Sequence, residues 1–290
     1  MHGIVIPLDP VIFHLGPLAL RWYGLMIGIG ILVGIWIDAR DAERTGIGRD
    51  HIYNIATWFV IGGIIGGRLY YVVQNDLGSY LAHPEHILAT WEGGMAFYGV
   101  FITCVPIAIW YTLRHRLPFW TLADTVILGL PLGQAFGRVG NIVNGDIVGY
   151  QTNSAFAFIY TNPNSFAPAL DTPFVPANLY ELLVSLGIFG ILWWARTRIR
   201  IPGMLFILYL YLYAISQFVI FFWRNNSITL FRLKQAQLTS LVVMLLLLPV
   251  ASYLWQRWKR THPGEPAMQK PTSPQFRHEQ APPHAQPPPA

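Results

Sequence analysis

The sequence predicts an all-α integral membrane protein, which we expect to be a bundle of seven transmembrane helices with an outward-facing polar cavity and a disordered C-terminal tail. Hydrophobic residues make up 53% of the chain and charged residues only 11%, whereas a soluble domain carries about 25% charged residues. Apolar runs also recur at lengths that can cross a hydrocarbon core about 30 Å thick. Composition and run length together therefore exclude an ordinary soluble domain.

Seven apolar runs give the predicted spans. They lie near residues 19–38, 52–73, 94–113, 120–137, 178–195, 203–223 and 237–256. No basic segment precedes the first run, so we expect it to be a retained helix rather than a cleaved signal peptide. The fourth run is the least regular, because Asp124, Pro131 and several glycines interrupt it.

Most lysine and arginine residues lie at one set of helix ends. They follow the first, third, fifth and seventh runs, as Arg40, Arg44, Arg49, Arg114, Arg116, Arg196, Arg198, Arg200, Arg257, Lys259 and Arg260. Because positive residues stay on the cytoplasmic side, we expect the N-terminus outside and the C-terminus in the cytoplasm. Arg224, Arg232 and Lys234 break this pattern, either as a tolerated exception or because their loop lies over an anionic lipid headgroup. The net charge of +5 mostly expresses the cytoplasmic bias, so it does not favour nucleic-acid binding.

The chain is expected to divide into a membrane domain, residues 1–260, and a cytoplasmic tail, residues 261–290. The tail is rich in proline and lacks apolar periodicity, which predicts disorder. Its His278 and His284 are expected to be solvated rather than metal ligands. The single cysteine, Cys104, can form no disulfide within the chain and is expected to be a small core residue. We expect no metal and no cofactor.

The most informative segment runs from residue 131 to residue 150 and reads PLGQAFGRVGNIVNGDIVGY. It closes the fourth apolar run with Arg138, Asn141, Asn144 and Asp146. A charge at that depth is costly unless it faces a protein-lined cavity, a partner or a polar ligand, so Arg138 is a candidate functional residue. The alternative is that Arg138 extends to the interface while the glycines of this segment serve close helix packing.

Further polar residues enter the bundle from the same, outer side. Arg21, Trp22 and Tyr23 precede a glycine-rich span, where interfacial anchoring is the alternative to a functional role. Arg68 follows four glycines in the second run and needs a neighbour. Glu181, at the outer start of the fifth run, is the expected partner, and a structural ion pair is the alternative for both residues.

Two more polar groups lie in the third and fourth runs. The third run is preceded by Trp91-Glu92-Gly93-Gly94-Met95, whose glycines predict a loosely wound start, and Tyr98 needs a hydrogen-bond partner if it is buried. Asp124 is nearer to the cytoplasmic side, and we expect it to hydrogen-bond a neighbouring helix. The outer half of the bundle is therefore the predicted place of a site.

The motifs at these positions resemble one family. The stretch GRVGNIVN that contains Arg138, followed by Gly145 and Asp146, resembles the signature of prolipoprotein diacylglyceryl transferases. Also in that family's order and spacing are RWYGLM at 21–26, GGR at 66–68, WEGGM at 91–95, LYE at 179–181, and Arg232 with Ala236-Gln237. The resemblance covers residues 10–256 and leaves out only the tail.

The resemblance implies a reaction in the bacterial cytoplasmic (inner) membrane. Members transfer the diacylglyceryl group of phosphatidylglycerol to the lipobox cysteine thiol of a preprolipoprotein signal peptide and release glycerol phosphate. Such a displacement needs a thiolate, a cation over the developing phosphate charge and a water-poor site. It implies no metal and no soluble cofactor.

The resemblance also implies roles for particular residues. Arg138 is the candidate phosphate clamp, because a guanidinium can hold phosphate oxygens in bidentate fashion. The candidates to activate the thiol are Asp146, Tyr98 or the field of the arginines. The remaining candidate substrate-binding residues are Asn141, Tyr23, Arg68, Asn144, Tyr213 and Arg224.

The chain departs from the family pattern in several places. Tyr98 stands where many members carry histidine, and its unperturbed pKa of about 10 makes it a poorer base than a histidine near 6.5. Aligned from Tyr213, Gln217 and Phe221 replace the usual arginine and glutamate, which looks like the joint loss of an ion pair. Val175-Pro176 replaces the usual His-Pro. Arg224, one turn beyond Phe221, is a candidate replacement for the missing cation.

Three functions compete. The first is an active transferase that uses Arg138 with Arg68 or Arg224. The second is a catalytically impaired relative that binds phosphatidylglycerol or lipoprotein precursors without transfer, which the departures at 98, 217 and 221 favour. The third, a transporter, is disfavoured because the polar cluster is confined to one half of the membrane.

Overall fold

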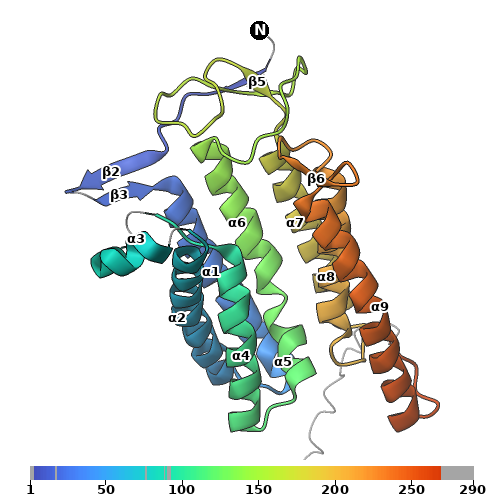
Figure 1. The fold of residues 1–290 in the computed structure, drawn as a ribbon. Coiled ribbons are helices and arrows are strands. Elements are labelled where there is room, and N and C mark those ends of the chain that lie inside the picture. The colour runs from blue at the N-terminus through green and yellow to red at the C-terminus, as the bar shows by residue number, and fades with distance from the viewer. Residues whose placement is uncertain (1–2, 17, 76, 88, 90–92, 269–290) are drawn as a thin grey trace, which may run out of the picture.

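The computed structural model describes residues 3–16, 18–75, 77–87, 89 and 93–268, and most of them are helical (Figure 1). The longer helices are α1 (Trp22–Thr45), α2 (Arg49–Gln74), α4 (Phe97–His115), α5 (Phe119–Val126), α6 (Gly129–Asn144), α7 (Ala177–Ala195), α8 (Met204–Ile220) and α9 (Gln235–Thr261). Helix α6 packs between α1 and α7, while α2 pairs with α4 and α8 pairs with α9. We call the end where α1 and α7 begin the upper end and the opposite end the lower end, as in Figure 1.

Each predicted apolar run overlaps at least one helix. By length and hydropathy, five helical segments in the described residues can cross a membrane: Trp22–Thr45, Arg49–Gln74, Phe119–Asn144, Ala177–Ala195 and Gln235–Thr261. Helix α8 is apolar but shorter, and α4 occupies the third run. The predicted membrane class is therefore confirmed.

The fourth run is interrupted, as Asp124 and Pro131 predict. Helix α5 ends at Val126, and α6 begins at Gly129. Pro131 lies in the first turn of α6, where a missing N–H breaks no helical hydrogen bond. Asp38 of α1 accepts a hydrogen bond at 2.7 Å from the Gly129 N–H, so a carboxylate of another helix satisfies this buried helix start.

Two glycine pairs bring α1 and α6 together. Gly34 lies so close to Gly129 that a Cβ added at residue 129 would stand 2.4 Å from the Gly34 carbonyl oxygen. A Cβ added at Gly30 would stand 3.0 Å from the Gly133 carbonyl oxygen. Because small residues allow this approach, α1 fixes the height and rotation of the helix that carries Arg138.

The all-α expectation is wrong at the upper end, where short strands pair. They are β1 (Ile4–Ile6), β2 (Val11–Leu15), β3 (Leu18–Arg21), β4 (Phe158–Tyr160), β5 (Pro173–Phe174), β6 (Ile228–Leu230) and β7 (Leu233–Lys234). Strand β4 pairs in parallel with β1 and antiparallel with β5, whereas β2–β3 and β6–β7 are hairpins. The pairing satisfies backbone groups of the long loop between α6 and α7. Below it, the short helices α3 (Leu77–Ala82) and η1 (Pro84–Ile87) join α2 to α4.

The beginning of the predicted tail packs on the lower end of the bundle. Thr261 is the last residue of α9, and residues 262–268 turn back toward the α7–α8 loop. Ile199 forms a β-bridge with Met268, and the Arg200 N–H donates to the Ala267 carbonyl at 3.1 Å. The structure thus describes residues 261–268 of the predicted tail in contact with the bundle, and the rest of the tail lies outside the described residues.

Candidate functional site

Arg138 lies in the second half of α6, near the upper end of the bundle. Its guanidinium donates from Nη1 to Asn141 Oδ1 at 2.9 Å and forms an ion pair from Nη2 to Glu181 Oε2 at 2.5 Å. Its side chain keeps 20% of its surface exposed, whereas that of Glu181 is 2% exposed. Arg138 is therefore oriented by fixed partners and still accessible to a ligand.

Glu181, in the first turns of α7, pairs with a second arginine. Arg224 follows α8, and its Nη1 lies 3.2 Å from Glu181 Oε1. Burial lowers the pKa of the Arg224 guanidinium below its usual value, while the nearby Glu181 carboxylate opposes that shift. Two guanidiniums thus share one buried carboxylate, which leaves this trio one formal positive charge in excess. Such a group is complementary to a singly charged anion.

A chain of amides extends from Arg138 into the long loop. Asn141 donates from Nδ2 to both carboxylate oxygens of Asp146, at 3.0 and 3.1 Å. Asn178 of α7 donates to the Asp146 backbone carbonyl at 3.3 Å and to the Tyr160 hydroxyl at 3.4 Å. Burial raises the pKa of Tyr160 to about 12, so this phenol stays protonated at neutral pH. The network holds the Asp146 carboxylate one side chain away from Arg138.

The backbone around Arg224 is held by the long loop and by Lys234. Gly149 forms a β-bridge with Arg224, and the Tyr150 N–H donates to the Trp223 carbonyl at 3.0 Å. The buried Lys234 donates from Nζ to the carbonyls of Phe221 and Arg224, both at 2.5 Å. Lys234 thereby donates to one carbonyl at the end of α8 and to one in the turn that follows it. The position of Arg224 therefore depends on three separate segments: α7 through Glu181, the long loop between α6 and α7, and the segment before α9 that carries Lys234.

Three other predicted substrate-binding residues border this cluster. Tyr23, at the start of α1, packs on α6, where a Cβ added at Gly140 would stand 2.8 Å from the Tyr23 Cα. Tyr213 of α8 lies near the charged groups of Arg138, Glu181 and Arg224 and stacks on Tyr209 with ring centroids 5.8 Å apart.

Asn144, the last residue of α6, is also buried near the cluster. Its side-chain Oδ1 has no hydrogen-bond partner in the described part of the chain. The predicted residues at 23, 138, 141, 144, 146, 213 and 224 therefore lie around one upper region. The Asn144 oxygen is thus a buried acceptor without a donor among the described residues.

Arg68 lies apart from this group. Its guanidinium donates to the carbonyls of Ile87 at 2.9 Å, His86 at 2.5 Å, Gly93 at 2.5 Å and Gly94 at 3.0 Å. The residue is 3% exposed. The expected ion pair with Glu181 is wrong, because that carboxylate bonds Arg138 and Arg224 instead. Arg68 orders the segment between α2 and α4.

The predicted loose start of α4 agrees with its backbone, as far as it is described. Gly93 and Gly94 precede the helix with φ of 88° and 82°, values that glycine adopts without strain. Trp91 and Glu92 of the same motif lie outside the described residues.

Tyr98 is half exposed and lines an upper cavity of about 400 Å³ together with Phe221 and Lys234. Two of the departures from the family pattern, Tyr98 and Phe221, therefore border one cavity. No hydrogen bond joins Tyr98 to the Arg138 cluster among the described residues. Tyr98 and Asp146, the two candidate bases for the thiol, therefore occupy different places. Asp146 is connected to Arg138 through Asn141, whereas Tyr98 lines the separate upper cavity.

Sequence reasoning missed Lys234 and Asn178 as parts of this arrangement. Asn178 precedes the recognised Leu-Tyr-Glu motif by one residue, which was an available signal. Lys234 appeared only as an exception to the charge pattern, and its contacts with α8 depend on a turn between α8 and α9 that sequence spacing does not reveal. In the described ranges, no group of three or more His, Cys, Asp or Glu side chains is arranged to hold a metal ion.

Fold and site define a helical membrane protein with a buried, cation-rich polar cluster near one end of the bundle. Residues 10–253 match the family described as prolipoprotein diacylglyceryl transferase. The chain is similar to the phosphatidylglycerol–prolipoprotein diacylglyceryl transferase of Thermosynechococcus vestitus, with 35% identity over 87% of this chain and 93% of the relative. The enzyme of that name from Bacillus licheniformis is 33% identical over 87% and 95% of the two chains. The corresponding Vibrio cholerae enzyme is 34% identical over 75% and 79%. The chain belongs to the prolipoprotein diacylglyceryl transferase family and is a transferase of lipoprotein biosynthesis.

Proposed function

We propose that this protein transfers the diacylglyceryl group of phosphatidylglycerol to the lipobox cysteine thiol of a preprolipoprotein. It would act in the bacterial cytoplasmic (inner) membrane, with seven spans, an N-terminus outside and a C-terminus in the cytoplasm. The upper end would then face outward and present the polar cavity to lipid and signal peptide. The clustering of basic residues at the lower end supports this orientation.

The observation that carries the proposal is the sharing of Glu181 by Arg138 and Arg224. The excess positive charge of this trio matches the single negative charge of a phosphodiester. Arg138 would hold phosphate oxygens with the N–H groups that Glu181 and Asn141 leave free. We assign the assisting cation to Arg224 rather than Arg68, because the Arg68 guanidinium already binds four backbone carbonyls.

The reaction is a displacement at carbon. The cysteine thiolate attacks the carbon of the diacylglyceryl group that is bonded to the phosphate oxygen. A C–S bond forms, and the bond between that carbon and the phosphate oxygen breaks. The electron pair leaves with glycerol phosphate, whose developing charge Arg138 and Arg224 would stabilise. The field of the two guanidiniums also favours the thiolate, and the thiol proton would pass to Asp146, the candidate base nearer to Arg138, with Tyr98 as the alternative.

A second function is favoured by the residues at 98, 217 and 221. A relative without the usual base and ion pair would bind phosphatidylglycerol or a lipoprotein precursor without transfer. Tyr98 and Phe221 border the same cavity, so their joint change would alter one local environment rather than two. The buried Lys234 beside them keeps a cation at that cavity, which supports the active enzyme instead.

The deciding experiment incubates the purified full chain in phosphatidylglycerol-containing membranes with a lipobox peptide and measures the mass of its cysteine. The active enzyme should add a diacylglyceryl mass that disappears in Arg138→Ala. Arg198→Ala, which removes a partly exposed arginine at the lower end, is the matched control and should retain the adduct. No adduct with wild type, combined with retained phosphatidylglycerol that Arg138→Ala loses, would establish the binding protein.

A further inference from the structure

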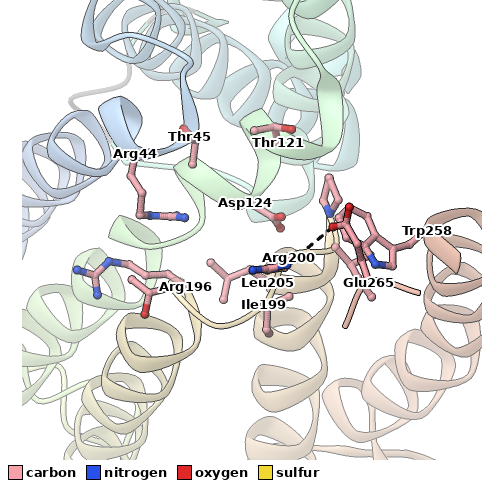
Figure 2. Close-up of a pocket in the computed structure, with 13 residues that line it drawn as sticks. Arg44, Thr45, Thr121, Asp124, Arg196, Ile199, Arg200, Leu205, Trp258 and Glu265 are labelled. Carbon is pink, nitrogen blue, oxygen red and sulfur yellow. Dashed lines mark ion pairs between the residues drawn. The ribbon is translucent and has the colours of Figure 1, made fainter. Parts of the chain in front are cut away.

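A second polar cavity lies at the lower end of the bundle, far along the helices from Arg138. It has a volume of about 420 Å³ and is lined by the ends of α1, α5, α8 and α9 and by the α7–α8 loop. Figure 2 shows Arg44, Arg196 and Arg200 around it, with Trp258 on the α9 side. None of these residues belongs to the transfer site.

Two of the carboxylates near this cavity, those of Asp41 and Asp124, are already hydrogen-bonded. Asp41 accepts from Arg44 Nε at 2.9 Å and from Arg196 Nε at 3.1 Å, so two guanidiniums share it. Asp124 accepts from the Gly203 N–H at 2.6 Å and the Phe206 N–H at 2.8 Å, which places both its oxygens at the start of α8. This confirms the predicted role of Asp124 as a hydrogen-bonding group between helices.

Several donors at the cavity remain available. Arg200 Nη1 forms an ion pair with Glu265 Oε2 at 3.8 Å, a separation too long for a hydrogen bond, so its N–H groups can still donate to a ligand. Trp258 Nε1 is buried and has no hydrogen-bond partner among the residues that the structure describes. A buried N–H without an acceptor is unfavourable, and an oxygen-rich ligand in the cavity would satisfy it.

The depth of the cavity agrees with a headgroup region. Tryptophans surround the lower end, and Trp36, Trp194 and Trp255 are exposed. Arg40, Arg198 and Lys259 lie over the rings of these three residues, at 5.6, 4.2 and 5.1 Å from the ring centroids. Tryptophan with basic residues is typical of a membrane–water interface, where anionic headgroups collect.

We propose that this lower cavity binds a phosphate group through Arg200, Trp258 Nε1 and the free N–H groups of Arg44. The phosphate would belong to an anionic phospholipid of the adjoining leaflet or to a soluble organic phosphate. Bound there, it would add a further link between α1, the α7–α8 loop and α9, beside the Asp41–Arg196 contact and the Arg200–Ala267 backbone hydrogen bond. The proposal does not depend on the transfer reaction at the opposite end.

Native mass spectrometry of the full chain in detergent, titrated with phosphatidylglycerol or zwitterionic phosphatidylcholine, tests it. Arg200→Gln and Trp258→Phe should each weaken retention of one phosphatidylglycerol about tenfold, the effect of one lost charge-assisted hydrogen bond. Arg198→Gln makes the same charge change two residues away and outside the cavity, so retention should be unchanged. The same loss should appear in an Arg138→Ala background, which separates this lipid from one held at the transfer site.

Equal retention by wild type, Arg200→Gln and Trp258→Phe would overturn the proposal. So would an equal loss in Arg198→Gln, because general surface charge would then explain the binding, or equal retention of phosphatidylcholine. A parallel arm follows thermal unfolding with inorganic phosphate and with glycerol 1-phosphate. Stabilisation that depends on Arg200 at micromolar concentration identifies a soluble phosphate, whereas lipid retention without such stabilisation identifies the headgroup.

Discussion

Arg68 and Arg138 have similar sequence surroundings and opposite roles in the fold. Both follow glycines in an apolar helix; Arg138 was the candidate phosphate clamp, and Arg68 was a candidate to assist it. Arg68 is almost fully buried and donates to four backbone carbonyls of the segment before α4. Arg138 remains one-fifth exposed and binds side chains, Glu181 and Asn141. A buried arginine bound to backbone holds a loop, whereas a partly exposed one bound to side chains can bind a ligand.

The largest expected effect is that of Arg138→Lys on transfer. Lysine keeps the charge but cannot hold Glu181, Asn141 and a phosphate together, since it lacks the planar fork. We expect kcat to fall about 100-fold or more, as when one preorganised oxyanion donor is removed. Initial rates with a lipobox peptide measure this, with Arg198→Lys as the matched control. Full activity of Arg138→Lys would exclude the clamp.

Local sequence predicted one half of this site. Arg138, Asn141 and Asp146 lie within nine residues, so helix geometry places Asn141 one turn beyond Arg138 without any knowledge of the fold. The pairing of Glu181 with Arg224 could not be predicted, because it depends on where α7 and α8 lie relative to α6.

The broken fourth span shows the same limit for the fold. Asp124, Pro131 and the glycines predicted an interruption, and α5 does end before α6 begins. The place of the break also depends on Asp38, which satisfies the start of α6 from another helix. A contact between helices that are distant in sequence leaves no periodic signal along the chain. The helices that occupy the apolar runs were predictable, because each run depends only on its own composition.

Arg224→Gln should have the next largest effect. Arg224 shares Glu181 with Arg138, and Gln retains a donor while removing the charge. The transfer rate should fall about tenfold, the loss of one charge-assisted contact. Rates at several phosphatidylglycerol concentrations would show whether kcat or KM changes. If the rate instead stays at the wild-type level, Arg138 acts without a second cation.

A smaller effect should separate the two candidate bases. Asp146→Asn keeps the shape of the contact with Asn141 but removes the carboxylate. We expect transfer to fall by about fivefold to tenfold, less than the about 100-fold or more typical of a general base, because the field of the two guanidiniums also favours the thiolate. Tyr98→Phe should change the rate less than twofold, since the Tyr98 hydroxyl lies outside the Arg138 network. Both variants are compared at neutral and alkaline pH with the same peptide. A larger loss in Tyr98→Phe would assign the proton to the phenol.

Arg68→Lys should change transfer least and stability most clearly. A single ammonium cannot reach the carbonyls of residues 86, 87, 93 and 94 together, so at least one buried acceptor loses its donor at a cost of about 1–3 kcal/mol. The melting temperature should fall by several degrees, at about 2–4 °C per kcal/mol for a chain of this size, while the transfer rate of the folded fraction stays within about twofold. Arg138→Lys supplies the reverse pattern under the same conditions. A rate loss in Arg68→Lys as large as that in Arg138→Lys, with an unchanged melting temperature, would show that backbone contacts do not distinguish a structural arginine from a ligand-binding one.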